Sequence, residues 1–216
     1  METIIAVKAG QNIFQKVILF SVIIDNLQQM YITILKICNP VLQSTYQLIN
    51  HKFMEQVFIG FGANLGDKFA IIKEAIRLIH INLGEVVSQS SLYESEPWGY
   101  ESNELFVNGV LEIATNLSPL ELLLGLKGIE STLGRKEKTL VTYSDRLIDL
   151  DILYYSDKNL NMSDLIIPHP HIYKRRFVLE PLVEIAPNFI DLRFYKTTRE
   201  LLKECSDTSV LKKIVF

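Results

Sequence analysis

The sequence predicts an α+β fold: a ferredoxin-like β-α-β-β-α-β sandwich with an additional C-terminal helix. Three observations support this expectation. From residue 57 onward, strand-like and helix-like segments alternate in that order, and a further helical segment follows them. No internal repeat or low-complexity segment interrupts the order. The chain has 216 residues, of which 48% are hydrophobic and 22% charged, enough for one or two compact domains with their own core.

The first half of this order runs to residue 115. A short apolar strand at 57–61 leads into a helix over residues 67–83, in which apolar side chains recur at helical spacing. Asp67 is suited to cap the first turn of that helix. Two strands are expected at 85–93 and 105–115, and the polar segment between them contains proline and glycine and therefore forms a loop.

The second half begins with Ser118 and Pro119, a combination typical of a helix start. This helix is expected to end near Leu133, where a glycine follows. Residues 147–155 then form a strand, and residues 174–185 a last helix before another proline. The remaining C-terminal residues are only weakly patterned.

The first 53 residues differ from the rest of the chain. They contain only two acidic residues and long apolar runs, such as V-I-L-F-S-V-I-I at 17–24. That run is shorter than the roughly 20 residues of a membrane span, and no secretory signal is evident. We therefore expect 1–53 to be a dispensable N-terminal extension, translated from an upstream start, and 54–216 to be the functional domain. The alternative is a helical appendage that packs on the domain or on a membrane surface.

The charge and the cysteine content of the chain bear on its binding partners and on its cellular compartment. The formal net charge is −3 and the pI about 5.8, which indicates no general affinity for nucleic acid, although a local basic cluster can still bind a small anion. Without 1–53 the chain keeps 18 basic and 23 acidic residues. Cys38 and Cys205 match no disulfide or metal spacing. We expect a monomer in the reducing cytoplasm, with no membrane span.

The last predicted strand contains two acids, Asp149 and Asp151. Side chains two apart on a strand point to the same face, so Leu150 and Ile152 point to the opposite face, into the core. Two neighbouring carboxylates repel, and one is pushed toward its protonated form unless a cation lies between them. Mg²⁺ commonly uses one or two carboxylates together with substrate phosphates, so a metal site is one hypothesis. The other is that these acids form salt bridges with basic residues such as Arg146.

Basic residues flank this strand in the sequence. Arginine presents a fork suited to phosphate oxygens and lysine a point charge, so with a metal they could surround a polyphosphate. For any single one of these residues, a solvated loop charge is the more common explanation. His169, held between two prolines, can donate to a phosphate or simply cap a loop. The basic residues in question are Arg135, Lys136, Lys138, Arg146, Lys174, Arg175 and Arg176.

The segment G-F-G-A-N-L-G at 60–66 resembles a nucleotide-binding loop only superficially. Its spacing is G-x-G-x-x-x-G, and no G-K-S/T follows, which excludes both the Rossmann and the Walker motifs. Its glycines instead allow a close approach of the backbone or a positive φ at the turn from strand to helix.

Aromatic and amide side chains cluster in the loop 94–104 and the strand after it. Trp98, Tyr100 and Phe106 offer flat faces, and Asn108 offers a donor and an acceptor. Together they are suited to hold a flat heterocycle. The alternative is that Phe106 belongs to the core and Trp98 is an exposed loop residue.

The chain resembles the 6-hydroxymethyl-7,8-dihydropterin pyrophosphokinases, enzymes of folate biosynthesis, over about Met54 to Pro187. The resemblance rests on seven blocks in the family's order and spacing. It implies transfer of pyrophosphate from ATP to the hydroxymethyl group of the pterin, which gives AMP. The blocks are G-A-N-L-G-D (62–67), S-L-Y-E-S-E-P-W-G (91–99), F-V-N (106–108), L-G-R (133–135), D-R-L-I-D-L-D-I-L (145–153), P-H-P (168–170) and R-x-F-V-L-x-P-L-x-E-I-A-P (175–187).

The resemblance also implies residue roles. ATP is the co-substrate, and two Mg²⁺ ions are bridged by Asp149, Asp151 and the ATP phosphates. No strong base is evident, and Asp151 is the candidate. Catalytic contacts to the phosphates fall to Arg135 and Arg146. The implied pterin-binding residues are Asn108, Phe177, Ser95, Pro97, Trp98 and Phe106. The implied nucleotide-binding residues are Lys127, Glu130, Ile152, His169, Arg175 and Lys138.

One stretch departs from the family pattern. Many members carry R-W-G-P-R before the paired aspartates, whereas this chain has T-Y-S-D-R at 142–146. Tyr143 stands where tryptophan is common and Thr142 where arginine is common, while Arg146 is kept. The stretch after L-G-R is K-E-K, less basic than in many relatives.

A second hypothesis comes from another functional class. The predicted order of elements also suits a non-catalytic ferredoxin-like module that binds a small ligand or other chains, because this fold hosts many functions. The acid pair, the arginines and the Asn-aromatic loop argue against that hypothesis.

Overall fold

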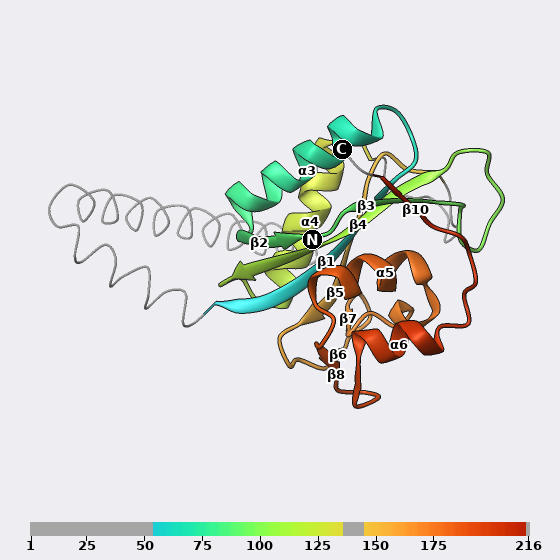
Figure 1. Cartoon of the computed structure of the whole chain (residues 1–216). Helices are drawn as coiled ribbons and strands as arrows, with labels where there is room; N and C mark the ends of the chain where they lie inside the picture. The colour runs from blue at the N-terminus through green and yellow to red at the C-terminus, as the bar shows by residue number, and fades with distance from the viewer. Residues whose placement is uncertain (1–53, 136–144, 215–216) are drawn as a thin grey trace, which may run out of the picture. The chain divides into compact units, whose positions relative to one another are not determined.

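The computed structural model describes residues 54–135 and 145–214. The expected extension 1–53 and Lys138 lie outside the described residues. A six-stranded antiparallel sheet forms the centre of the described part, with helices on both of its faces (Figure 1). Its elements are β1 (Glu55–Ala63), α3 (Lys68–Asn82), β2 (Glu85–Gln89), β3 (Leu92–Ser95), β4 (Phe106–Thr115), α4 (Pro119–Thr132), β5 (Asp149–Tyr155), β6 (Leu160–Asn161), β7 (Ile166–Ile167), the 3-10 turn η1 (Ile172–Lys174), α5 (Arg176–Ile185), β8 (Ile190–Asp191), β9 (Lys196–Thr197), α6 (Thr198–Glu204) and β10 (Lys212–Ile214).

The sheet order confirms the predicted fold class. Strand β1 lies between β4 and β5, and both β2 and β3 pair with β4. Every one of these pairs is antiparallel. When β2 and β3 are taken as one interrupted strand, the arrangement is that of the ferredoxin-like β-α-β-β-α-β unit. Strand β5, which carries the acid pair, ends one edge of the sheet, and β10 ends the other.

Two hydrophobic clusters pack against the two faces of the sheet. Helices α3 and α4 cover one face, and α5 and α6 cover the other (Figure 1). We call these the α3/α4 core and the α5/α6 core. Leu150 and Ile152 are buried in the α3/α4 core, as the sequence predicted for the residues next to the acids. Asp149 and Asp151 therefore share the other face of β5.

A bulge interrupts β5 just beyond the acid pair. Leu153 has no partner in β1, because the register shifts at this point. As a result Leu153 and Tyr154 both belong to the α5/α6 core, although they are adjacent in sequence. The bulge thus divides this face of β5 into a polar end, with the two aspartates, and an apolar end that packs under α5.

Helices α3 and α4 begin directly after the residues predicted at their starts, Asp67 and Ser118. The Asp67 carboxylate accepts a hydrogen bond from the Ala70 N–H at 3.0 Å. Ser118 and Glu121 form a capping box at the start of α4. These side chains satisfy N–H groups that have no partner within the helix.

The predicted strand at 85–93 is two strands in the structure. Ser90 separates them: its N–H donates to the Val110 carbonyl and its Oγ accepts from the Val110 N–H, each at 3.0 Å. The Ser90 hydroxyl thus occupies the position of a backbone carbonyl in the ladder. Strand β3 then continues to Ser95, into the segment predicted as a loop.

The weakly patterned C-terminal residues form regular structure that the sequence did not predict. Helix α6 begins with a capping box between Thr197 and Glu200. The β8–β9 hairpin is fixed to β5 by Asp191, which is fully buried and accepts hydrogen bonds from Tyr154 and Arg193. Burial acts to raise the pKa of the Asp191 carboxyl, but these bonds outweigh it and lower that pKa.

No helix in the described part of the chain is long and apolar enough to cross a membrane.

Gly109 in β4 is predicted not to tolerate a methyl group. An added Cβ would lie 2.3 Å from Cζ of Phe61, whose ring is buried in the α3/α4 core. We expect Gly109→Ala to lower the free energy of unfolding by about 1–3 kcal/mol, the usual cost of overpacking a core. Urea denaturation of the full chain measures this.

The matched control is Gly128→Ala in α4, where no atom lies within 4 Å of the added Cβ. Alanine is the better helix former, so this change is expected to raise stability by about 0.5–1 kcal/mol. Equal effects of the two substitutions would contradict the packing argument.

Candidate active site

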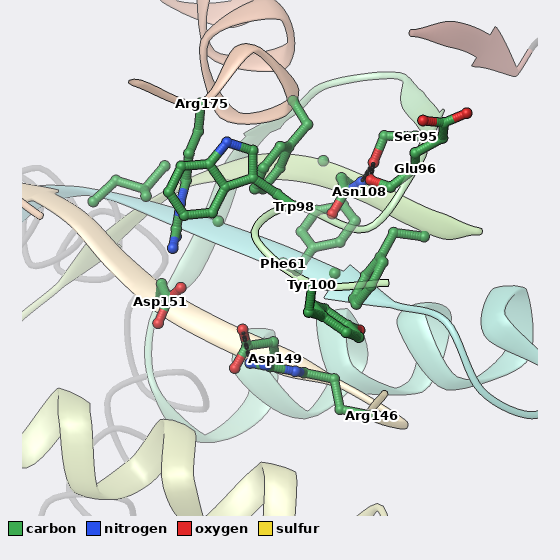
Figure 2. A pocket seen from close by; sticks show the side chains of 16 residues that line it. Phe61, Ser95, Glu96, Trp98, Tyr100, Asn108, Arg146, Asp149, Asp151 and Arg175 are labelled. Carbon is green, nitrogen blue, oxygen red and sulfur yellow. Dashed lines mark hydrogen bonds and ion pairs between the residues drawn. The ribbon is translucent and has the colours of Figure 1, made fainter. Parts of the chain in front are cut away.

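One pocket brings together most of the polar and aromatic side chains that the sequence singled out (Figure 2). Strands β1, β4 and β5 contribute to it from the sheet, and the loop after β3 and the start of α5 contribute from above. Its lining residues are Gly60, Phe61, Gly62, Ser95, Glu96, Trp98, Tyr100, Phe106, Asn108, Gly109, Arg146, Asp149, Asp151, Leu153, Arg175 and Phe177.

Asp149 lies between two arginines. Its Oδ1 accepts a hydrogen bond from Nη1 of Arg135 at 2.7 Å, and its Oδ2 accepts one from Nη1 of Arg146. Both pairs are charge-assisted and partly shielded from water, so they are stronger than exposed ion pairs. The salt bridges that the sequence left open as an alternative are therefore present at Asp149.

Glu130 connects helix α4 to the strand that carries the acids. Its Oε1 accepts a hydrogen bond from the Leu150 N–H at 2.8 Å and another from Arg135. Burial raises the pKa of the Glu130 carboxyl, while Arg135 acts in the opposite direction. Because Leu150 lies between the two aspartates on an edge strand, Glu130 fixes both the strand and one arginine that holds Asp149.

Asp151 is the second acid of the pocket. Burial, together with the charge of Asp149, raises the pKa of Asp151 to about 7. Figure 2 shows the Arg175 side chain reaching toward Asp151 from the opposite wall. A divalent cation between the acids would favour their charged forms.

The two aspartates fit a magnesium site that is completed by a ligand. Among the described residues, no three His, Cys, Asp or Glu side chains form a ready cluster for a metal. Mg²⁺ commonly binds one or two carboxylates and takes its remaining ligands from phosphates and water. A structural zinc site would instead need four protein ligands.

The other half of the pocket is aromatic. The Arg175 guanidinium lies 4.7 Å from the ring centroid of Trp98 and 5.7 Å from that of Phe177. Such cation-π contacts orient both rings toward the pocket. Phe106 lines the same region, so its side chain is not confined to the core. Trp98 likewise lies at the pocket wall rather than on an isolated surface loop (Figure 2).

Asn108 is held in one orientation at the back of this aromatic half. Its Nδ2 donates to Oγ of Ser95 at 2.9 Å, and both residues are buried. Its Oδ1 lies over Gly62, where an added Cβ would be only 2.7 Å away. The expectation that a glycine of the 60–66 segment allows a close approach is confirmed here, and Gly66 has the positive φ of +66°.

His169 lies beyond the bulge of β5 and does not line the pocket. Its N–H donates to the Leu153 carbonyl at 2.9 Å, and Arg193 donates to its carbonyl at 3.4 Å. Burial, assisted by the positive charge of Arg175, lowers the pKa of His169 to about 4. Its Nδ1 accepts a hydrogen bond from the His171 N–H at 3.3 Å, so the ring proton is on Nε2.

Two further residues proposed for nucleotide binding, Ile152 and Lys127, and one proposed for pterin binding, Pro97, do not line the pocket. Ile152 is buried in the α3/α4 core, on the face of the sheet opposite Asp151. Lys127 is exposed on α4, one turn before Glu130. Pro97 lies in the loop between two lining residues.

Several residues of the site were not singled out individually from the sequence. Phe61 and Glu96 line the pocket, and Asn64 binds Asp145 at its rim, with Nδ2 2.6 Å from Oδ1. Asn64 and Asp145 are 81 positions apart, so no local periodicity could have linked them. The only sequence signal was that each falls inside a block of the family resemblance.

The fold and the pocket define a class: a ferredoxin-like α+β protein with aromatic and amide groups at one end of a pocket and paired acids with arginines at the other. Such a site is suited to a flat polar ring beside a polyanion. The family model described as 7,8-dihydro-6-hydroxymethylpterin-pyrophosphokinase (HPPK) matches residues 58–187. The chain belongs to this family.

Several relatives share this family name. The 2-amino-4-hydroxy-6-hydroxymethyldihydropteridine pyrophosphokinase of Aquifex aeolicus is 40% identical over 151 residues, which are 70% of this chain and 92% of that protein. The enzyme of the same name from Bacillus subtilis is 42% identical over 130 residues, or 60% of this chain and 77% of that protein.

Solved structures agree on the fold. A crystal structure of HPPK-DHPS in complex with substrates superimposes with a TM-score of 0.59 at 16% sequence identity. The match covers 70% of this chain and 43% of that one, so the chain corresponds to less than half of the HPPK-DHPS protein. At this identity the likeness supports the fold alone.

His169 is predicted to remain neutral across the physiological pH range. Since the pKa lies near 4, well below the usual value of 6.5, protonation should begin only in acid. In ¹⁵N NMR spectra of the protein without nucleotide, we expect the Nε2-protonated tautomer and no titration between pH 8 and about 5.5.

The matched comparison is Arg175→Met, which removes the positive charge that disfavours protonation. It should raise the pKa of His169 without reversing the effect of burial. Titration of His169 at its usual pKa in the unmodified protein would show that the ring is not shielded as the structure indicates.

Proposed function

We propose that this chain transfers pyrophosphate from ATP to the hydroxymethyl group of 6-hydroxymethyl-7,8-dihydropterin, releasing AMP, as a step of folate biosynthesis. Membership in the pyrophosphokinase family supports the reaction. The observation that carries the proposal is that one pocket joins an aromatic-amide half to an acid-arginine half. A ring substrate and a polyphosphate can therefore meet in it.

The aromatic half is the proposed pterin site. Phe177 and Trp98 supply ring faces for stacking, with Phe106 close by. Asn108, oriented by Ser95, supplies an amide to the donor and acceptor edge of the pterin. Because these groups are already hydrogen-bonded or packed, binding orders few side chains. The backbone at Pro97 is proposed to complete the wall.

The acid-arginine half is the proposed site of the ATP phosphates. Arg135 and Arg146 already reach the Asp149 carboxylate and can turn their remaining N–H donors to phosphate oxygens. Arg175 approaches from the opposite wall, and a neutral His169 with its proton on Nε2 is suited to donate to a phosphate or ribose oxygen.

Four further nucleotide contacts remain predictions from the resemblance. Glu130 acts through Arg135 rather than by facing the pocket. Lys127 and Ile152 do not line the pocket, and Lys138 lies outside the described residues. The Ile152 side chain is buried in the α3/α4 core, so only the backbone of Ile152 could contact the adenine.

In the proposed reaction the hydroxymethyl oxygen attacks the β-phosphorus of ATP in line, the bond from that phosphorus to the α-phosphate oxygen breaks, and AMP leaves. The chain contributes chiefly by positioning the two substrates and by stabilising charge. We assign contacts with the transferred group to Arg146 and Arg175, which line the pocket, and to Arg135, which binds Asp149 beside it. Asp151 is the proposed acceptor of the hydroxyl proton. Mg²⁺, two ions of which we propose are held by Asp149, Asp151 and the phosphates, supplies positive charge when bound.

We further propose that residues 54–216 carry the activity, with 1–53 dispensable, and that the enzyme is a cytoplasmic monomer. An AMP-release assay with ATP and the hydroxymethyl pterin, run on the chains 1–216 and 54–216, tests the reaction and the extension together. Equal turnover by both supports the proposal. Absence of AMP from both would refute the function, and loss in 54–216 alone would refute the domain assignment.

Asp149→Ala and Asp151→Ala are each predicted to reduce AMP release at least about a hundredfold, since charge stabilisation by a bound metal is worth several kcal/mol. The fold should survive, because both side chains line a pocket rather than a core. Circular dichroism provides the check on folding.

The matched control is Asp157→Ala, an exposed acid shortly after β5, which should leave turnover unchanged. Calorimetric titration with a non-hydrolysable ATP analogue separates an enzyme from a binding module: heat should depend on Mg²⁺ in the unmodified chain and not in the Asp149 and Asp151 variants. Normal activity of either variant would contradict the proposal that Asp149 and Asp151 hold the metal.

Gly62→Ala is predicted to impair pterin binding selectively. The added Cβ would press on Oδ1 of Asn108 and move the amide away from Ser95. Displacing a buried hydrogen-bonding group of this kind should raise the KM for the pterin about tenfold. The KM for ATP should change little, because the phosphates bind at the other half. A larger effect on ATP than on the pterin would contradict the assignment of the two halves.

A further inference from the structure

Asp145 is a hydrogen-bonding centre at the rim of the pocket, although no sequence feature marked it as functional. Its Oδ1 accepts from Nδ2 of Asn64 at 2.6 Å and from the Tyr100 hydroxyl at 2.9 Å. Its Oδ2 accepts from Oγ of Ser102 at 3.0 Å. One carboxylate thus connects the segment after β1 with two residues of the loop between β3 and β4.

Asn64 connects this centre to the acid-arginine half of the pocket. Its Oδ1 accepts from the Arg146 N–H at 2.8 Å, and its own N–H donates to the Arg146 carbonyl at 3.2 Å. Arg146 in turn binds Asp149 through its side chain. The backbone next to Asp145 is therefore held by Asn64, the residue directly after β1.

The loop that Asp145 fixes carries part of the aromatic half. Trp98 and Tyr100 both line the pocket (Figure 2). Burial, together with its bond to Asp145, raises the pKa of the Tyr100 hydroxyl to about 12, so this group stays a donor. Burial acts to raise the pKa of Asp145, but the bonds from Ser102, Asn64 and Tyr100 outweigh it and lower that pKa. Asp145 therefore stays an acceptor at neutral pH.

We propose that Asp145 is a positioning residue for pterin recognition: it holds the loop with Trp98 and Tyr100 against the sheet and so sets the aromatic wall before the substrate binds. The proposal rests on the proposed function. Asp145 does not line the pocket, and it acts through the loop. A wall that is already ordered lowers the entropic cost of binding the ring.

The side-chain carboxylate of Asp145 makes this arrangement possible. The stretch T-Y-S-D-R replaces the R-W-G-P-R pattern, and proline at this position would offer no side-chain acceptor.

The experiment measures both KM values and kcat for Asp145→Ala, Tyr100→Phe and the double variant of the full chain. Loss of hydrogen bonds to a charged acceptor should raise the pterin KM about tenfold in Asp145→Ala. The KM for ATP should stay within about twofold. Because the Tyr100 hydroxyl and Asp145 are hydrogen-bonded to each other, the effect of the double variant should be smaller than the product of the two single effects. Glu101→Ala, an exposed acid of the same loop, is the matched control and should leave all constants unchanged.

Trp98 provides a readout that does not need activity, because it is the only tryptophan of the chain. In Asp145→Ala, its emission should shift to longer wavelength and become more accessible to acrylamide, and Glu101→Ala should show neither change. Asp145→Asn keeps one acceptor oxygen, so it should restore part of the protection and part of the pterin KM.

The outcomes distinguish the alternatives. If Asp145→Ala lowers the melting temperature but leaves both KM values as in the unmodified chain, the residue is merely structural and the proposal is overturned. The same holds if the variant raises the KM for ATP as much as the KM for the pterin. Multiplicative effects of Asp145→Ala and Tyr100→Phe would also overturn it. If Asp145→Ala does not fold, the same measurements on Asp145→Asn decide. If the unmodified chain releases no AMP, the proposed function fails, while the Trp98 measurements still test whether Asp145 orders the loop.

Discussion

The structure of the site depends on how the Asp149 carboxylate is paired on an edge strand. A carboxylate that is partly removed from water is costly unless it is paired. Here Arg135 and Arg146 donate to its two oxygens from different segments of the chain. Glu130 then fixes Arg135 and the backbone of the strand. The contacts that offset the cost of partly burying this carboxylate also bring together the cations that a polyphosphate needs.

The pocket has two chemically different halves because β5 and the loop after β3 lie on opposite sides of it. Arg175 belongs to both halves: its guanidinium lies over Trp98 and Phe177, and its charge acts on Asp151. A planar cation can stack on rings and still attract carboxylates or phosphates, which an ammonium group does less well. This one side chain therefore links ring recognition to phosphate recognition.

Much of the fold followed from local patterns. The helix starts at Asp67 and Ser118 were predictable because capping chemistry involves residues three positions apart. The break at Ser90 was not, because it depends on a pairing with Val110 across the sheet. The capping box that begins α6 is an equally local signal, yet the apolar spacing around it is too weak to have identified the helix.

The sequence by itself determined that Asp149 and Asp151 share a face, because side chains alternate along any strand. It also determined the family, through blocks that keep their order. Only the tertiary structure decided that Arg135 joins Arg146 at Asp149, and that Asp145 joins Asn64 to Tyr100. These facts depend on contacts between residues far apart in the chain, and no periodicity of the sequence records such contacts.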